Sequence, residues 1–108
     1  MAKLYTVTVT LDNSVPPNFS FSPDPVVDHG KATISWVQGS ANFEFAALAF
    51  DHLNPFQNVV VTDREITAVD DNQVREDHKY SVLVKVNHVY YSSLGGGMGA
   101  GGPTIRNN

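Results

Sequence analysis

The stretch KYSVLVKVNHVYY, residues 79–91, carries the longest strand signal in this chain. Apolar or aromatic residues recur at every second position, which is the period of a β-strand with one buried face. No window of eleven or more residues shows the 3.6-residue period of an amphipathic helix. We expect one long strand, with the following residues on a single, inward face: Tyr80, Val82, Val84, Val86, His88 and Tyr90.

Outward from this stretch, clusters of Pro, Gly, Asp and Asn divide the chain into short strand-like segments. Residues 42–45 also alternate, whereas 46–50 stay open between strand and helical turn because Ala and Leu favour helix. The pattern predicts an all-β fold, an antiparallel immunoglobulin-like or fibronectin-type β-sandwich of about seven or eight strands. The remaining predicted strands are residues 5–11, 18–22, 26–27, 32–38, 56–62 and 65–69.

A local motif agrees with this class of fold. Residues 77–84 read D-x-x-Y-x-V-x-V, which is similar to the start of a late strand in immunoglobulin-like sandwiches. There the tyrosine hydroxyl bonds to upstream backbone, an arrangement known as the tyrosine corner. We therefore expect this role for Tyr80, although the cysteine pair of antibody domains is absent.

Composition bounds the functions that the chain can have. Its 108 residues suit one domain, and the absence of cysteine excludes disulfides, zinc–thiolate sites, thiol catalysis and type-1 copper. Seven basic and eleven acidic residues give a net charge of -4. That sign argues against nucleic acid and anionic membranes as partners, because both require a basic surface.

The N-terminal residues 1–13 do not read as a signal peptide, because threonines alternate with apolar residues there. No apolar run is long enough to span a bilayer. The cytoplasm is the default location on these grounds, with a mature chain that has lost its leader as the alternative.

The segment GMGAGG, residues 97–102, matches G-x-G-x-x-G, the dinucleotide-binding pattern. That pattern works only where the glycines open a helix, and here only Pro103 and five further residues follow. We expect a β-sandwich domain at residues 1–94 and a glycine-rich C-terminal tail at 95–108. The tail is read as a flexible linker, as the domain's own last short strand, or as a strand added to another subunit.

Four segments together suggest a family resemblance. They are YTVTVTLDN at 5–13, PPNFSFSPDP at 16–25, ATISW at 32–36 and PTIRN at 103–107. In this layout the chain resembles the DP-EP family of small bacterial proteins. The resemblance implies a compact β-sandwich of unassigned function, and it supplies no functional residues.

No set of residues predicts catalysis, a cofactor or a metal site. The histidines at 29, 52, 78 and 88 show no ligand spacing, and no serine lies in a G-x-S-x-G motif. The acidic residues 63, 65, 70, 71, 76 and 77 read as ordinary solvated turns, with a calcium-binding loop as the alternative.

We therefore expect a non-enzymatic domain that binds a protein partner or self-associates, through an edge strand or through the tail. A carbohydrate- or small-ligand-binding module that uses exposed aromatic residues is the alternative, together with the calcium-binding sandwich. Alternation turns one of two adjacent tyrosines outward. The candidate interaction residues are Tyr90, Tyr91, Thr104 and Ile105.

Overall fold

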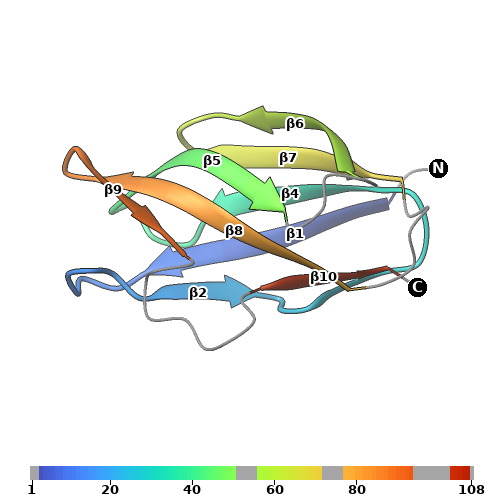
Figure 1. Ribbon diagram of the computed structural model, residues 1–108, viewed down its shortest axis with the longest axis horizontal. Coiled ribbons are helices and arrows are strands. Elements are labelled where there is room, and N and C mark those ends of the chain that lie inside the picture. The colour runs from blue at the N-terminus through green and yellow to red at the C-terminus, as the bar shows by residue number, and fades with distance from the viewer. Residues whose placement is uncertain (1–2, 51–55, 72–76, 94–102, 108) are drawn as a thin grey trace.

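The computed structural model describes residues 3–50, 56–71, 77–93 and 103–107. This part of the chain is all-β, and its ten strands form two five-stranded sheets that pack as a sandwich (Figure 1). The first sheet has the order β2-β1-β4-β7-β6; the second has the order β3-β10-β8-β5, with β9 also paired to β8. The strands are β1 (Lys3–Leu11), β2 (Phe19–Ser22), β3 (Val26–Asp28), β4 (Ala32–Gln38), β5 (Glu44–Phe50), β6 (Phe56–Val61), β7 (Glu65–Asp70), β8 (Asp77–Val86), β9 (Val89–Ser92) and β10 (Thr104–Asn107).

The predicted long strand at 79–91 is a hairpin, so this prediction was wrong. Asn87 and His88 have φ angles of 49° and 67°, and they form a two-residue turn between β8 and β9. Positive φ at both central residues matches the right-handed twist of the two strands, and Asn adopts this conformation more readily than most residues. The turn places His88 in solvent, not on the inward face.

Two strand pairs are parallel, which the antiparallel prediction did not contain. β1 pairs parallel with β4, and β10 pairs parallel with β3; the other pairs are antiparallel. After β2 the chain crosses to the second sheet at Pro23 and Pro25, and it returns to the first sheet in β4. Parallel neighbours need a long connection, and the passage of the chain through β2 and β3 supplies it for β1 and β4.

The segment left open at 46–50 is strand. β5 pairs with β8 along its length, with a bulge between Phe45 and Ala47. Leu48 and Phe50 of β5 pack against the core, so burial in the sandwich overrides the helix preference of Ala and Leu.

The core lies between the sheets and contains the residues that alternation selected. Ala32, Ile34 and Trp36 of β4 are fully buried on one face, as predicted. The Trp36 ring makes an edge contact with the Tyr80 ring, at a centroid distance of 5.3 Å. Contacts between large rings help protein interiors to pack as densely as crystals of small organic molecules.

Tyr80 is buried in β8, and its tyrosine corner stays a prediction because the upstream residues 72–76 lie outside the described residues. Its hydroxyl has no hydrogen-bond partner among the described residues. Burial raises the pKa of Tyr80, because the phenolate would lose its hydration. Tyr80 therefore serves the core through its ring contacts.

The C-terminal strand belongs to the sandwich. β10 lies between β3 and β8, and it pairs with the first residues of β8 while β9 pairs with the last. Both strands run antiparallel to β8, and the glycine-rich residues between them fall outside the described residues. The domain therefore extends beyond Leu94, to Asn107.

Candidate association surface

The two edge strands β5 and β6 lie side by side on one margin of the sandwich, at the top of Figure 1. At one end, the Phe45 N–H donates to the Asp63 carbonyl oxygen at 2.9 Å. At the other end, the rings of Phe50 and Phe56 stack with centroids 4.0 Å apart and planes at 3°. Between these contacts no ladder joins the two strands in the described part of the chain. We call β5 and β6 together the open seam.

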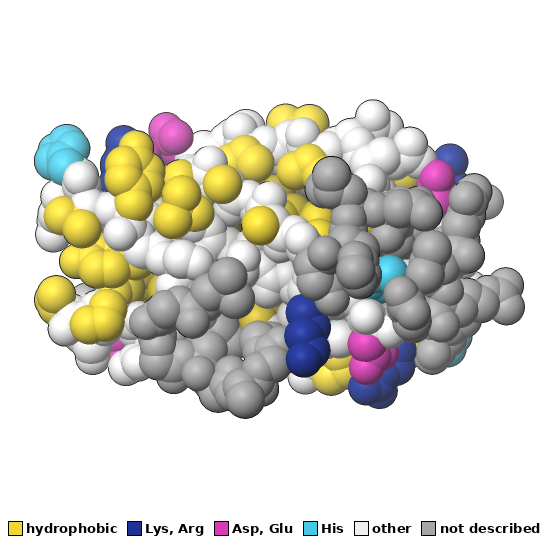
Figure 2. Space-filling model, in the orientation of Figure 1, with side chains coloured by type: hydrophobic (Ala, Val, Ile, Leu, Met, Phe, Trp, Pro, Cys, Tyr) yellow, Lys and Arg dark blue, Asp and Glu magenta, His cyan; other side chains and the backbone are white. Residues whose placement is uncertain are grey.

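Three consecutive valines are exposed on β6. Val59, Val60 and Val61 expose 41%, 55% and 37% of their surface. A bulge between Gln57 and Val60, with Asn58 at a φ of 54°, turns this part of the edge. Val60 lies opposite Thr67 and faces outward, whereas Val61 lies opposite the buried Ile66 and faces the seam. Figure 2 shows hydrophobic side chains gathered over β5, β6 and the β8–β9 hairpin.

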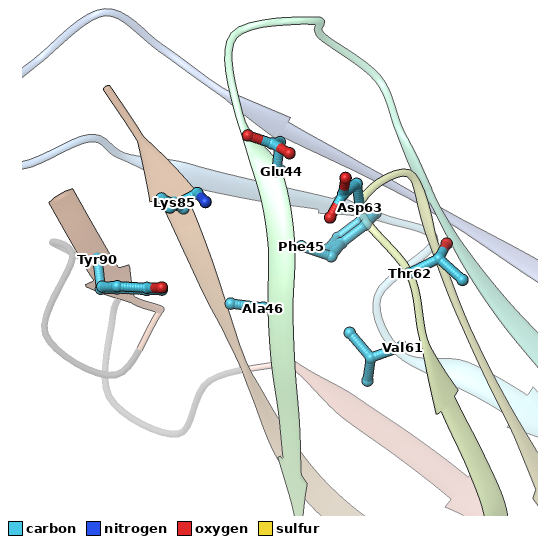
Figure 3. A pocket seen from close by; sticks show the side chains of 8 residues that line it. All are labelled: Glu44, Phe45, Ala46, Val61, Thr62, Asp63, Lys85 and Tyr90. Carbon is cyan, nitrogen blue, oxygen red and sulfur yellow. The ribbon is translucent and has the colours of Figure 1, made fainter. Parts of the chain in front are cut away.

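A shallow groove of about 310 Å³ lies at the end of the seam nearest Asp63 (Figure 3). Glu44, Lys85 and Tyr90 are in cross-strand register and present a carboxylate, an ammonium and a phenol in one row. The volume is at the lower end of ligand pockets. The groove is lined by Glu44, Phe45, Ala46, Val61, Thr62, Asp63, Lys85 and Tyr90.

The predicted interaction residues separate into two groups. Tyr90 exposes 59% of its surface beside the groove, whereas Tyr91 is half-buried against the core. Ile105 is completely buried, and Thr104 is half-buried and paired with Lys79, so β10 completes the chain's own sheet. β10 belongs to the same chain as β3 and β8. Its effective concentration next to them is therefore far higher than that of any strand from a second molecule.

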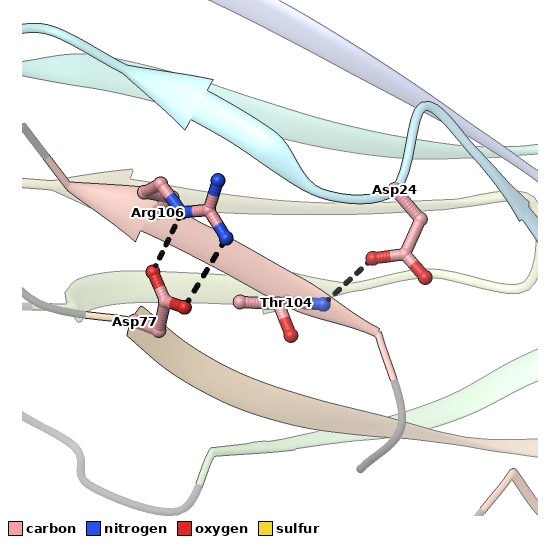
Figure 4. A network of polar contacts seen from close by, with 4 residues as sticks. All are labelled: Asp24, Asp77, Thr104 and Arg106. Atoms are coloured by element: carbon pink, nitrogen blue, oxygen red, sulfur yellow. Dashed lines mark hydrogen bonds and ion pairs between the residues drawn. The ribbon is translucent and has the colours of Figure 1, made fainter. Parts of the chain in front are cut away.

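Polar contacts hold β10 on its exposed side (Figure 4). The Thr104 N–H donates to Asp24 at 3.0 Å. The Arg106 guanidinium donates to Asp77 at 2.9 Å, and this bond holds the pKa of Asp77 below its ordinary value. These contacts reinforce the assignment of β10 to the domain.

The histidines do not gather into a site. His29 and His88 are exposed, His78 is fully buried, and His52 lies outside the described residues. Within the described ranges, no three His, Asp or Glu side chains are placed to share a metal ion.

One of the predicted solvated carboxylates is buried. Asp70 has no exposed surface, while Asp63, Glu65 and Asp77 are exposed and Glu76 lies outside the described residues. The sequence held a signal for this: Asp70 continues the alternation of Ile66 and Ala68 on the inward face. It joins three other buried polar side chains, Asp28, His78 and Asn107.

The exposed β6 valines were not singled out from the sequence. Residues 56–62 were predicted as a strand, but the position of a strand within its sheet depends on long-range pairing. The available signal was the run of three valines, because alternation cannot turn three consecutive side chains inward.

No protein-family model matches the chain, and no curated protein is similar enough to align with it. In the described residues, no helix has the length and apolar character needed to cross a membrane.

Proposed function

We propose that this chain is a non-enzymatic association module that pairs with a second copy of itself through the open seam. The single observation that carries the proposal is the exposed, uncharged β6 edge. Within the described residues β6 forms a ladder only with β7, so one side of its backbone lacks a strand partner. An unpaired edge of this kind is a template for strand addition.

The charge distribution favours a second copy as the occupant. The chain carries a net charge of -4, yet residues 56–62, FQNVVVT, contain no charged side chain. Two copies therefore meet along β6 without placing like charges opposite each other, which would destabilise the pair. Antiparallel β6–β6 pairing is also the arrangement that a twofold axis produces, with the same patch on both subunits.

The test is light scattering after size exclusion over a range of protein concentrations. We place the twofold axis of the proposed pair beside Val60, the most exposed valine of β6. We expect the wild-type chain to shift from monomer to dimer as concentration rises, and Val60→Lys to stay monomeric because it places two ammonium groups across this axis. Val15→Lys is the matched control, since Val15 is 85% exposed in the β1–β2 loop, away from the seam. A wild-type chain that is monomeric throughout, or a Val60→Lys variant that dimerises unchanged, would contradict the proposal.

We infer further that the sandwich is of the immunoglobulin-like type. Supporting this, β4-β7-β6 and β5-β8-β10 match the B-E-D and C-F-G strand orders of that fold, and β3 lies parallel to the last strand. β1 is then an additional strand between β2 and β4. The resemblance to the DP-EP family is compatible with this arrangement.

Tyr90 supports a second candidate, a carbohydrate-binding module. Its ring is exposed beside Glu44 and Lys85, and sugars stack on aromatic rings while bonding to flanking polar groups. A glycan array in which wild type and Tyr90→Ala both give no signal would remove this candidate.

A further inference from the structure

Four polar side chains are buried together at one end of the sandwich, and they come from both sheets. Asp28 of β3, Asp70 of β7 and His78 of β8 have no exposed surface, and Asn107 of β10 has 2%. β7 belongs to the first sheet and the other three strands to the second. Buried ionisable groups are rare and are tolerated only with partners.

The contacts within this group are specific. The Asn107 side-chain amide donates to Asp70 Oδ1 at 3.0 Å, and Asp28 Oδ1 accepts the Gly30 N–H at 3.2 Å. Asn107 also lies opposite Asp28 in the β3–β10 ladder, so both buried aspartates are neighbours of the same amide side chain. Two neighbouring buried carboxyl groups can share a hydrogen bond only while one of them keeps its proton, because two carboxylates have no donor between them.

We propose that the Asp28–Asp70 pair is a proton-dependent latch that holds the C-terminal strand β10 closed in acid and loosens it as the pH rises to neutrality. β10 is the element affected because its Asn107 is the neighbour of both aspartates. Asn107 lies directly opposite Asp28 in the β3–β10 ladder, and its amide binds Asp70 across the sheets. Loss of the shared proton puts two negative charges beside it.

The surrounding charges do not cancel this effect. Burial is the main cause that raises the pKa of Asp28 to about 6, followed by the hydrogen bond and the charge of Asp70. The Gly30 N–H and the charge of Lys3 on β1 act in the opposite direction but are smaller. His78 faces the group from β8; Lys31 is engaged with Asp71 at 3.8 Å, and Arg106 with Asp77 on the exposed side.

The pH window follows from the direction of the shift. The folded pKa of Asp28 lies above its unfolded value of 3.8, so folding favours the protonated form. Its stabilising contribution is complete below pH 3.8 and is lost as the pH rises to about 6. Two pKa units correspond to a change on the order of a hundredfold in the population of the opened strand.

Hydrogen–deuterium exchange of the full chain tests the latch, with rates corrected for the intrinsic effect of pH. Between pH 4 and pH 7 we expect the amides of β10 to lose on the order of a hundredfold in protection, while those of β4 lose much less. Asp28→Asn should abolish the difference, since an amide donates to Asp70 at every pH. Asp63→Asn is the matched control and should keep the wild-type response, because Asp63 is exposed in the turn between β6 and β7 and does not belong to the strands next to β10.

The proposal is overturned if β10 and β4 respond alike, or if Asp28→Asn keeps the pH response. A second measurement does not depend on a variant. Carbon-13 NMR of the wild-type side-chain carboxyl groups should show the Asp28 carboxyl group titrating well above the ordinary range of aspartate. A spectrum in which every aspartate titrates below pH 5 contradicts the latch.

Discussion

The two margins of the sandwich are built differently. On one, here called the closed margin, the edge strands β2 and β3 have only four and three residues, and Pro23 and Pro25 lie between them. On the other, the open seam, β5 and β6 have seven and six residues, and three exposed valines follow one another. Short strands and prolines are the means by which proteins protect a sheet edge, because they leave few backbone groups to pair.

The difference indicates that the open seam is not a general feature of this chain's surface. The same fold protects one margin and leaves β6, on the other margin, without a charged side chain and with three exposed valines. Exposed Val60 on a long edge would be an aggregation hazard in a domain without a partner. Pairing with a second copy gives that edge a defined occupant and limits further growth, because a twofold contact is closed.

The largest expected effect on stability comes from removing β10, the strand that pairs with β3 at the closed margin. A chain that ends at Leu94 lacks β10, so it loses the buried Ile105 and leaves β3 without its neighbour. We expect the free energy of unfolding to fall by about 4 kcal/mol or more, from the lost apolar burial and hydrogen bonds. Urea denaturation measures it, and a truncated chain as stable as the full chain would show that β10 is dispensable.

The ring stack at the end of the seam is the next target. Phe56→Ala removes a buried ring that stacks on Phe50 and meets the His78 ring edge-on at 5.2 Å. We expect a loss of about 3 kcal/mol. Phe21→Ala on the closed margin is the matched control, and it should cost about half as much because Phe21 is only partly buried. Equal losses in thermal unfolding would remove the structural distinction between the margins.

How much of the fold could be predicted from the sequence depended on how far apart in sequence the interacting residues are. The alternation of residues 32–38 reports which side chains are buried, and Trp36 lies in the core as predicted. The turn at Asn87 and His88 contains neither glycine nor proline, and the alternation continues through it. The local pattern therefore could not reveal this turn. The burial of Ile105 depends on β3 and β8, which are distant in sequence.

The candidate surface was less predictable for the same reason. Residues 56–62 read correctly as strand, but only the sheet order shows that β6 lies at an edge and that Val60 is exposed. Tyr90 was singled out from local alternation alone, and its exposure is a local property. The meeting of Asp28 with Asp70 needs both sheets to be assembled, which no short motif encodes.

The smallest effect concerns the bulge of the seam. Asn58 has a φ of 54°, a conformation that costs an alanine about 1 kcal/mol. We expect Asn58→Ala to lower the free energy of unfolding by this amount, and Asn58→Gly to leave it nearly unchanged. The same pair of substitutions at Asn87, whose φ is 49°, gives the comparison in a turn outside the seam. If alanine is tolerated at residue 58 but not at residue 87, the bulge is not held in this conformation.

The central claim is that β6 pairs with β6 of a second copy, and the absence of cysteine allows a direct measurement. A single Val60→Cys substitution puts one thiol on each copy close to the twofold axis. Under mild oxidation we predict a covalent dimer, since facing residues of paired strands come within disulfide range. Val15→Cys, equally oxidised, should remain monomeric. A Val60→Cys chain that cross-links no faster than Val15→Cys would contradict the account.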